Sequence, residues 1–297
     1  MSLIIVNKDF EPTWCNMPEE EYHADKSAVN SSSLKLLKKS PFAFKRQFID
    51  GDNPTKTTKQ MKFGSLAHMA LLEASRFRDT YVVMPDFTGL TLDGRESKQS
   101  KEARSRKTEW IEEQELLGRM IVTQEERDKL FWMVDSVMAN PEATRLLKDG
   151  QPEVTGYYAD PVTGILCRIR PDFLAFDLSV LVDIKTVSDA DLDFIRRCRV
   201  EDVKYNYPFQ MAMYSEGAEV ISKKKIEHRV WIFIENEFPF ECVVLPMEEL
   251  YFDYGKRQYR ESLNNLKQCI DSDVWSRIPS MQTMFPTDYF LNKQEIP

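Results

Sequence analysis

The sequence predicts an α/β (α+β) protein in which a helical N-terminal region precedes a β-rich region with the order β-β-β-α-β. A change of pattern along the chain supports this class. Apolar residues recur at helical spacing up to about residue 140, whereas after Gly150 short apolar and β-branched runs alternate with turn residues. A composition of 42% hydrophobic and 30% charged residues is typical of a folded globular protein, and 297 residues suffice for a sizeable core.

The first part of the helical region is expected to be irregular. Residues 1–30 mix polar and aromatic side chains without a clear period, so we predict an irregular arm. A helix should follow, capped by Asn30 or Ser31 and interrupted by Pro41, after which the next phenylalanines continue in a second set of helical turns. Residues 51–59 are rich in turn residues and predict a loop.

Regular helices are predicted farther along this region. Residues 61–77 carry alanines and a leucine at helical spacing, so one helix is expected there. Residues 85–106 hold proline, glycine and many basic residues without a period, which predicts an exposed loop that lies beside a substrate. Two helices are expected over 107–118 and 123–140, and Pro141 ends the helical region or starts a last short turn.

The β-rich region begins with three short apolar segments separated by turn residues, which predict a meander. The three predicted strands are 153–160, 165–176 and 179–187. They should be followed by helices over 189–199 and 208–220, strands over 228–235 and 240–246, and a final amphipathic helix over 247–270.

The formal net charge of −8 argues mildly against nucleic acid as a partner, because a DNA-binding surface neutralises phosphates with lysine and arginine. Binding depends on local clusters, however, and an acidic exterior around a basic groove would satisfy both observations. A solvated face is the alternative interpretation of each cluster. The clusters are Lys35, Lys38, Lys39, Lys45 and Arg46; Lys98, Lys101, Arg104, Arg106 and Lys107; and Lys223, Lys224 and Lys225.

Other compositional features narrow the class of protein. No segment approaches the roughly 20 apolar residues of a membrane helix, and the N-terminus lacks the pattern of a signal peptide, so we expect a cytoplasmic protein that does not bind a membrane. The five cysteines are far apart and form no CxxC pair, which predicts neither a disulfide framework nor a zinc or iron–sulfur site.

The segment RPDFLAFDLSVLVDIK contains the most informative polar residues. Side chains two apart on a strand share a face, so Asp183 and Lys185 should point the same way and Ile184 the opposite way. A hairpin would bring Asp172 beside them. Unpaired charges in apolar surroundings cost several kcal/mol, so this cluster is not explained by core packing. An Asp183–Lys185 salt bridge on an edge strand is the alternative, because DxK alone is a common pattern.

A bound magnesium ion would offset the free-energy cost of placing these carboxylates in apolar surroundings. Mg²⁺ is held by one or two carboxylates, water and phosphate oxygens, and the main-chain carbonyl of Ile184 is a further candidate ligand. Two metal ions about 4 Å apart serve many phosphodiesterases, so we expect two ions, with Mn²⁺ able to replace Mg²⁺. Lys185 would orient or help to deprotonate the attacking water and balance negative charge in the transition state.

Four more residues fit this interpretation. His68 follows a glycine on the helix predicted over 61–77 and is a candidate metal ligand, with a structural histidine as the alternative. Glu153 begins the first predicted strand, where it could reach the metal or a bound water; an exposed strand glutamate is the alternative. Gln210 and Tyr214 lie one helical turn apart on one face and could contact phosphate or the lysine, or form a buried hydrogen-bonded pair.

This ordered set of motifs resembles the PD-(D/E)xK nuclease superfamily, and within it the RecB-like and RecE-type (exonuclease eight) branch. The resemblance covers roughly residues 24 to 270, and the five-part set is far more specific than any one member. The early segment NSSSLKLLKKSPFAFKRQFI also looks like the opening helix of that branch. The motifs are GSLAH (His68), EVTGYY (Glu153), RPD (Asp172), DIK (Asp183 and Lys185) and QMAMY (Gln210 and Tyr214).

The resemblance implies a restriction-endonuclease-like αβββαβ core and a bacterial or phage-encoded enzyme. It implies that His68, Asp172, Asp183 and the Ile184 carbonyl bind the metal and that Lys185 is catalytic. Ser33, Ser40 and Arg46 would lie near the DNA end or its phosphates. One nuclease domain over 1–297 would comprise a helical region (24–148), a β-rich catalytic core (150–250) and a C-terminal helix and tail (247–297).

The function implied is that of a magnesium-dependent exonuclease, which degrades one strand of double-stranded DNA from its 5′ end and leaves a 3′ overhang for recombination. Its partners would be double-stranded DNA ends, a single-strand annealing protein of the RecT type, and further copies of the chain in a ring. The chain lacks the cysteine cluster of the iron–sulfur members and the helicase motif GxxxxGK[ST].

Three alternatives remain open at this stage. The chain could be another nuclease of the superfamily, structure-specific, single-strand-specific or endonucleolytic. It could be a DNA-end-binding module without catalysis, although the intact Asp172, Asp183 and Lys185 set disfavours this. A helical scaffold that binds only protein is a third alternative, and it predicts no magnesium-dependent loss of DNA.

Overall fold

A five-stranded mixed sheet lies at the centre of the computed structural model, which describes residues 10–52, 58–91, 95–202, 204–279 and 284. Its strand order is β12-β11-β10-β9-β6, and only the central pair β10 and β11 is parallel. The strands are β6 (Gly150–Pro152), β9 (Phe173–Ala175), β10 (Val180–Val187), β11 (His228–Glu235) and β12 (Cys242–Pro246). Such a parallel pair requires a crossover connection, which here contains helices.

The crossover between β10 and β11 runs through α9 (Leu192–Ile195), a π-helical turn η2 (Arg196–Val200) and α10 (Tyr207–Ser222). The helices predicted over 189–199 and 208–220 are therefore confirmed. So are the strand over 228–235, the strand over 240–246, and the final helix, which is α11 (Glu249–Ser272).

The predicted three-stranded meander is wrong. The segment predicted as one strand over 165–176 divides into β8 (Leu166–Ile169) and β9, and the chain passes between two sheets at this break. Pro171 provides the physical reason, because it has no N–H to donate to a strand partner and restricts the residue before it. β8 belongs to a second sheet, ordered β1-β7-β8, with β1 (Thr13–Cys15) and β7 (Thr155–Ala159).

Each face of the central sheet packs against a separate hydrophobic core. Leu181, Trp231 and Phe233 belong to the core shared with α10, α11 and the N-terminal helices. Val182 and Ile184 belong to the core shared with α4 (Lys59–Leu72) and α7 (Gln124–Ala139). Because side chains alternate along a strand, Asp183 and Lys185 face the first core and Ile184 faces the second.

The N-terminal helices begin where the sequence predicts. α2 (Ser31–Lys39) starts with a capping box in which the Asn30 side chain accepts from Ser33 N–H and Ser33 Oγ accepts from Asn30 N–H. After Pro41 the chain continues in α3 (Pro41–Phe44) and a π-helical turn η1 (Lys45–Ile49), the predicted second set of turns.

Residues before α2 are more ordered than predicted. Besides β1, the segment contains α1 (Glu19–Ala24), whose Tyr22 is buried. The expectation of an irregular arm is therefore wrong from Thr13 onward, because contacts with distant residues, such as the pairing of β1 with β7, decide its structure. Residues 1–9 lie outside the described part of the chain.

The helix predicted over 61–77 is interrupted at Glu73, which separates α4 from α5 (Ala74–Thr80). The expected helix over 123–140 is α7, and a short α8 (Pro141–Leu146) follows Pro141.

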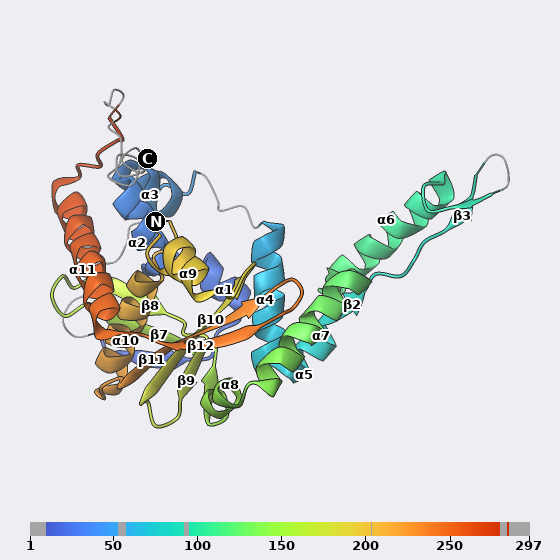
Figure 1. Ribbon diagram of the computed structural model, residues 1–297. Helices are drawn as coiled ribbons and strands as arrows, with labels where there is room; N and C mark the ends of the chain where they lie inside the picture. Colours follow the sequence, from blue (N-terminus) through green and yellow to red (C-terminus); the bar gives the residue numbers. More distant parts are fainter. Residues whose placement is uncertain (1–9, 53–57, 92–94, 203, 280–283, 285–297) are drawn as a thin grey trace, which may run out of the picture.

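An arm projects from the body of the molecule on the side of α4 (Figure 1). It contains α6 (Lys101–Leu116) and two small pairs of strands. The prediction of a loop over 85–106 is wrong in part, since β3, β4 and the start of α6 lie within it; residues 92–94 are outside the described residues. The strands are β2 (Tyr81–Val83), β3 (Gly89–Leu90), β4 (Glu96–Ser97) and β5 (Met120–Val122).

Among the residues that the structure describes, no helix is both long enough and apolar enough to cross a membrane.

Candidate active site

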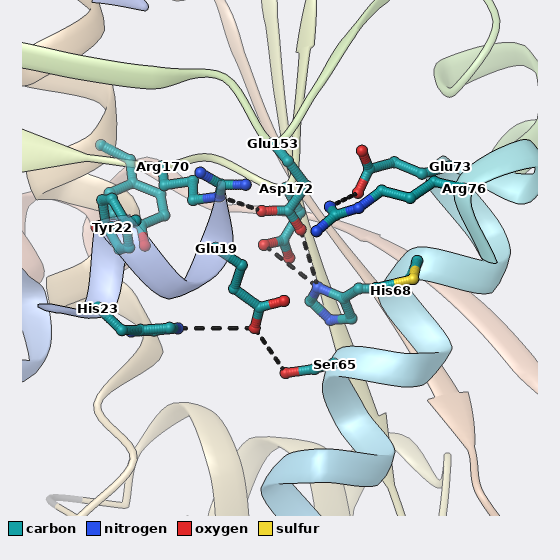
Figure 2. A pocket seen from close by; sticks show the side chains of 12 residues that line it. Glu19, Tyr22, His23, Ser65, His68, Glu73, Arg76, Glu153, Arg170 and Asp172 are labelled. Carbon is teal, nitrogen blue, oxygen red and sulfur yellow. Dashed lines mark hydrogen bonds and ion pairs between the residues drawn. The ribbon is translucent and has the colours of Figure 1, made fainter. Parts of the chain in front are cut away.

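Polar side chains from four segments meet beside α4, and Figure 2 shows those of His68, Glu153 and Asp172. His68 comes from the third turn of α4, and Glu153 from the residue after β6. Asp172 precedes β9, and Asp183 and Lys185 lie on β10.

Lys185 joins the two aspartates. Its Nζ donates to Asp183 Oδ1 at 2.6 Å and lies 3.9 Å from Asp172 Oδ2. Asp172 is in turn held by β10, because its Oδ2 accepts from the backbone N–H of Ile184 at 2.6 Å. The three side chains predicted to cluster therefore do so, although Asp172 enters from the turn before β9 and not from a meander.

His68, Glu153 and Asp172 form a group able to hold a metal ion. His68 Nδ1 lies 3.5 Å from Glu153 Oε1 and 3.6 Å from Asp172 Oδ1, and the candidate ligand atoms all lie within 4.8 Å of one another. His68 Nε2 donates to the carbonyl of Ile184 at 3.0 Å, which turns Nδ1 toward the carboxylates. One imidazole and two carboxylates suit a divalent cation of the Mg²⁺ or Mn²⁺ kind.

This group differs from the ligand set that the resemblance implies, because Glu153 takes part in it and Asp183 does not. Asp183 Oδ1 accepts from both Lys185 and Gln210, whereas its Oδ2 is buried without a hydrogen-bond partner among the described residues. A buried acceptor without a partner costs free energy, so Oδ2 has a place for a ligand, a cation or a proton. The Ile184 carbonyl accepts from His68 and Lys185, and its role as a metal ligand stays a prediction.

Burial and charge shift the pKa values of this cluster. Burial raises the pKa of Asp183 to about 6, although Lys185 opposes the shift. Burial would lower the pKa of His68, but the Asp172 and Glu153 carboxylates outweigh it and raise this pKa to about 9. Burial likewise opposes protonation of Lys185, yet Asp183 and Asp172 hold its pKa above the ordinary value of lysine. Lys185 is therefore a cation at neutral pH.

Arg170 positions Glu153 and was not found by sequence reasoning. Its Nε donates to Glu153 Oε2 at 2.8 Å, and its Nη1 donates to the carbonyl of Met17 and to Thr155 Oγ1. Glu153 itself has a left-handed backbone with φ of 50° and donates its N–H to the carbonyl of Asp172. The only sequence feature that could have identified Arg170 is its position, directly after an apolar strand and before Pro171 and Asp172.

Gln210 and Tyr214 lie on one face of α10, as predicted from their spacing. Gln210 Nε2 donates to Asp183 Oδ1 at 3.1 Å and to the Tyr214 hydroxyl at 3.2 Å. Gln210 thus helps to orient Asp183. Any contact of either residue with phosphate stays a prediction.

A cavity of about 160 Å³ opens beside the metal-ligand group. His68, Glu153 and Asp172 line it together with residues of α1 and α4. Glu19 reaches it from α1 and accepts from Ser65 Oγ at 3.0 Å, with His23 also beside it (Figure 2). The hydrogen bonds from His23 and Ser65 lower the pKa of Glu19 to about 2. Sequence reasoning missed this contribution of α1 because it predicted an irregular arm there.

Lys35 on α2 is a second basic residue close to the site. Its Nζ donates to the carbonyl of Tyr205 at 2.6 Å. Burial, together with the nearby charge of Lys185, lowers the pKa of Lys35 to about 7. The sequence placed Lys35 in a basic cluster, but nothing in the pattern distinguished it from its exposed neighbours.

The three residues expected near DNA are distributed differently. Ser33 is fully buried in the capping box of α2, and Ser40 is buried as the cap of α3, where its side chain accepts from Ala43 N–H. Arg46 is exposed and pairs with Asp52 at 2.7 Å. The structure thus gives both serines a role in helix capping, and DNA contact by these three residues stays a prediction.

Comparisons with known proteins agree with this fold. A family model described as a PDDEXK-like domain of unknown function (DUF3799) matches residues 30–279. Among solved structures, the chain is similar to a crystal structure from Eubacterium rectale described as a "Putative exonuclease", with a TM-score of 0.59 and 13% sequence identity over 95% of this chain and 100% of that chain. At this identity the likeness concerns the fold alone. The search of curated proteins found no match.

Proposed function

The chain belongs to the PDDEXK-like family, and from this premise we propose that it is a metal-dependent deoxyribonuclease. The observation that carries the proposal is the meeting of Asp172, Asp183 and Lys185 with His68 and Glu153 beside α4. More specifically, we propose a magnesium-dependent exonuclease that degrades duplex DNA from the 5′ end and leaves 3′ overhangs. The resemblance of the motifs to RecE-type enzymes favours an exonuclease over an endonuclease, and the Eubacterium rectale protein of similar fold is itself described as a "Putative exonuclease".

His68, Glu153 and Asp172 would hold the metal, and the unpartnered Oδ2 makes Asp183 a further ligand candidate. When bound, such an ion lowers the pKa of a water molecule and stabilises negative charge on a phosphate. His68 serves this set through Nδ1, because Nε2 is engaged by the Ile184 carbonyl. Arg170 prevents rotation of the Glu153 carboxylate by binding its second oxygen.

Lys185 acts as a cation and hydrogen-bond donor and not as the base in this arrangement. Its Nζ proton is held by Asp183 at 2.6 Å and its pKa is raised, so it does not accept a proton near neutral pH. A buried ammonium group stabilises the negative charge that develops on a phosphate when the P–O bond breaks. Gln210 keeps Asp183 oriented toward Lys185.

The partners of the enzyme are part of the proposal. We infer that it acts on double-stranded DNA ends, assembles as a ring of identical chains, and works with a single-strand annealing protein of the RecT type in recombination. These inferences rest on the resemblance of the motifs to RecE-type enzymes.

Linear and closed circular duplex DNA, each with and without Mg²⁺, test the proposal on one gel. We expect loss of the linear molecule only with Mg²⁺ and no change of the circle, because an exonuclease requires an end. Labelling each 5′ and 3′ end in turn determines the polarity. Cleavage of the circle would favour an endonuclease, and an unchanged linear substrate under all conditions would exclude the nuclease proposal.

Lys185→Ala provides the matched test of the site. Removing one donor that stabilises transition-state charge costs about 10²-fold to 10³-fold in rate. We therefore expect such a loss in single-turnover cleavage, with binding of linear duplex retained. Arg145→Ala, at an exposed arginine outside the site and outside the basic clusters, should cleave like the unchanged protein. Equal cleavage by all three proteins would contradict the assignment of Lys185.

A further inference from the structure

The tip of the arm is formed by β3, β4 and the first turns of α6, at the end of the arm that lies farthest from the body (Figure 1). The segment is held as a unit. Ser100 caps α6 by accepting from Ala103 N–H, and Gly89 packs so closely on this cap that a Cβ atom there would lie 2.6 Å from Ser100 Oγ. The rings of Phe87 and Trp110 lie 5.9 Å apart and further join the β3 segment to the helix.

The charges of α6 are separated along its length. Its first seven residues carry four cations and one glutamate, and its last eight carry four glutamates and no cation. All of these charged side chains are exposed. The cations are Lys101, Arg104, Arg106 and Lys107, and the glutamates of the second half are Glu109, Glu112, Glu113 and Glu115.

This order of charges opposes the helix dipole. Positive charge near a helix N-terminus and negative charge near its C-terminus each cost roughly 0.3 to 1 kcal/mol. Lys101 and Arg104, which lie in the first turn, therefore do not serve the stability of the helix, and Arg106 and Lys107 lie too far along it to gain from the dipole. A feature that lowers local stability without a structural gain indicates a function in binding.

The four cations also have no acidic partner within the described part of the chain. Arg104 donates to the carbonyl of Gln99 and Arg106 to that of Thr88, and both bonds leave the positive charge without a counter-charge. Lys101, Arg104 and Lys107 follow one another at intervals of three residues, so they form a stripe along one side of the helix that is about 9 Å long. Phosphate groups would supply the missing negative charge.

We propose that the tip of the arm binds the phosphate backbone of duplex DNA whose end is held at the active site. This inference rests on the proposed nuclease function and adds a second, remote contact to it. Helix α7 follows the arm in the chain, and it shares one hydrophobic core with α4, the helix that carries His68. The base of the arm therefore lies beside the active site. With 16 residues, α6 is about 24 Å long, so the tip contacts DNA roughly seven base pairs from the base of the arm.

The test compares DNA of two lengths in binding assays without divalent metal, in which no cleavage occurs. Each duplex, of about 5 or about 30 base pairs, is closed by a hairpin at one end and open at the other. The protein is titrated into each duplex, and fluorescence anisotropy measures binding at several salt concentrations. The test variant is K101Q/R104Q/K107Q. The matched control is R145Q/R197Q/R257Q, which makes the same change of charge at three exposed arginines that belong to none of the basic clusters.

We expect the tip variant to bind the long duplex at least about tenfold more weakly. The plot of log K against log salt concentration should become less steep by about 2 to 3, because each lost phosphate contact reduces the magnitude of this slope by about 0.9. Binding of the short duplex should not change. The control variant should bind both duplexes like the unchanged protein.

Other results overturn the inference in distinguishable ways. A tip variant that binds both lengths normally excludes the remote DNA contact while leaving the nuclease proposal intact. If this variant instead loses self-association in sedimentation, the tip binds an acidic surface of a second copy. A protein that neither binds nor cleaves any duplex refutes the nuclease proposal and this inference together.

Discussion

Arg170 illustrates how a single residue outside the candidate ligand set controls it. It holds one oxygen of Glu153, which leaves the other oxygen to face His68. Residues that orient a metal ligand contribute about 10-fold to 100-fold to metal affinity. Arg170 is thus a positioning residue in the candidate site.

Replacing Arg170 by glutamine should weaken metal binding by about this factor, because the Glu153 carboxylate becomes free to rotate. Isothermal titration with Mn²⁺ measures the affinity. Arg76→Gln is the control, since Arg76 lines the same cavity but pairs with Glu73. Equal Mn²⁺ affinities for the Arg170 variant and the unchanged protein would show that Glu153 does not need this support.

At the scale of elements, the close packing of α10 on α11 holds the catalytic side of the sheet together. Gly255 of α11 lies against the start of α10, and a Cβ atom there would lie 2.1 Å from the carbonyl oxygen of Pro208. Backbone cannot yield as a flexible side chain can, so this contact excludes any larger residue. Gln210 and Tyr214 depend on this packing for their position.

Gly255→Ala should lower the free energy of unfolding by about 3 kcal/mol or more, because overpacking of this kind forces the backbone of two helices apart. Gly64→Ala is the matched control in α4, where the nearest atom to a new Cβ is 3.9 Å away. There alanine should stabilise the protein by about 0.5 to 1 kcal/mol. Urea denaturation measures both values, and a neutral Gly255 variant would contradict the close packing.

For the whole molecule, stability in the absence of metal should depend on pH through two half-buried groups of opposite effect, His68 and Lys35. The raised pKa of His68, about 9, gives a stabilising contribution that is fully present below about pH 6.5 and lost as pH rises through 9. The lowered pKa of Lys35, about 7, has the opposite effect. Its charged form destabilises the folded state fully below pH 7, and this cost decreases as pH rises from 7 toward 10.5.

Urea denaturation in EDTA between pH 6 and 9.5 separates the two effects. The free energy of unfolding of the unchanged protein minus that of His68→Gln should decrease as pH rises. The free energy of unfolding of the unchanged protein minus that of Lys35→Met should increase over the same range. If both differences changed in the same direction with pH, the burial and charge environment described for one of these residues would be wrong. Asp183 adds a loss of stability as pH rises through about 6, so the series begins there.

The amino-acid sequence by itself determined the features that have a local period. Alternation along a strand placed Asp183 and Lys185 on one face, helical spacing placed Gln210 beside Tyr214, and the capping residues Asn30 and Ser31 marked the start of α2 to within one residue. These predictions succeeded because a period of two or 3.6 residues follows from backbone geometry alone.

Only the tertiary structure decided which segments meet. It divided the predicted meander at Pro171, brought α1 to the cavity, and placed Arg170 beside Glu153 and Glu153 beside His68. It also half-buried Lys35 while leaving the cations at the tip of the arm exposed. Burial and contacts between distant residues leave no period in the sequence, because they depend on how elements pack and not on the backbone of any one element.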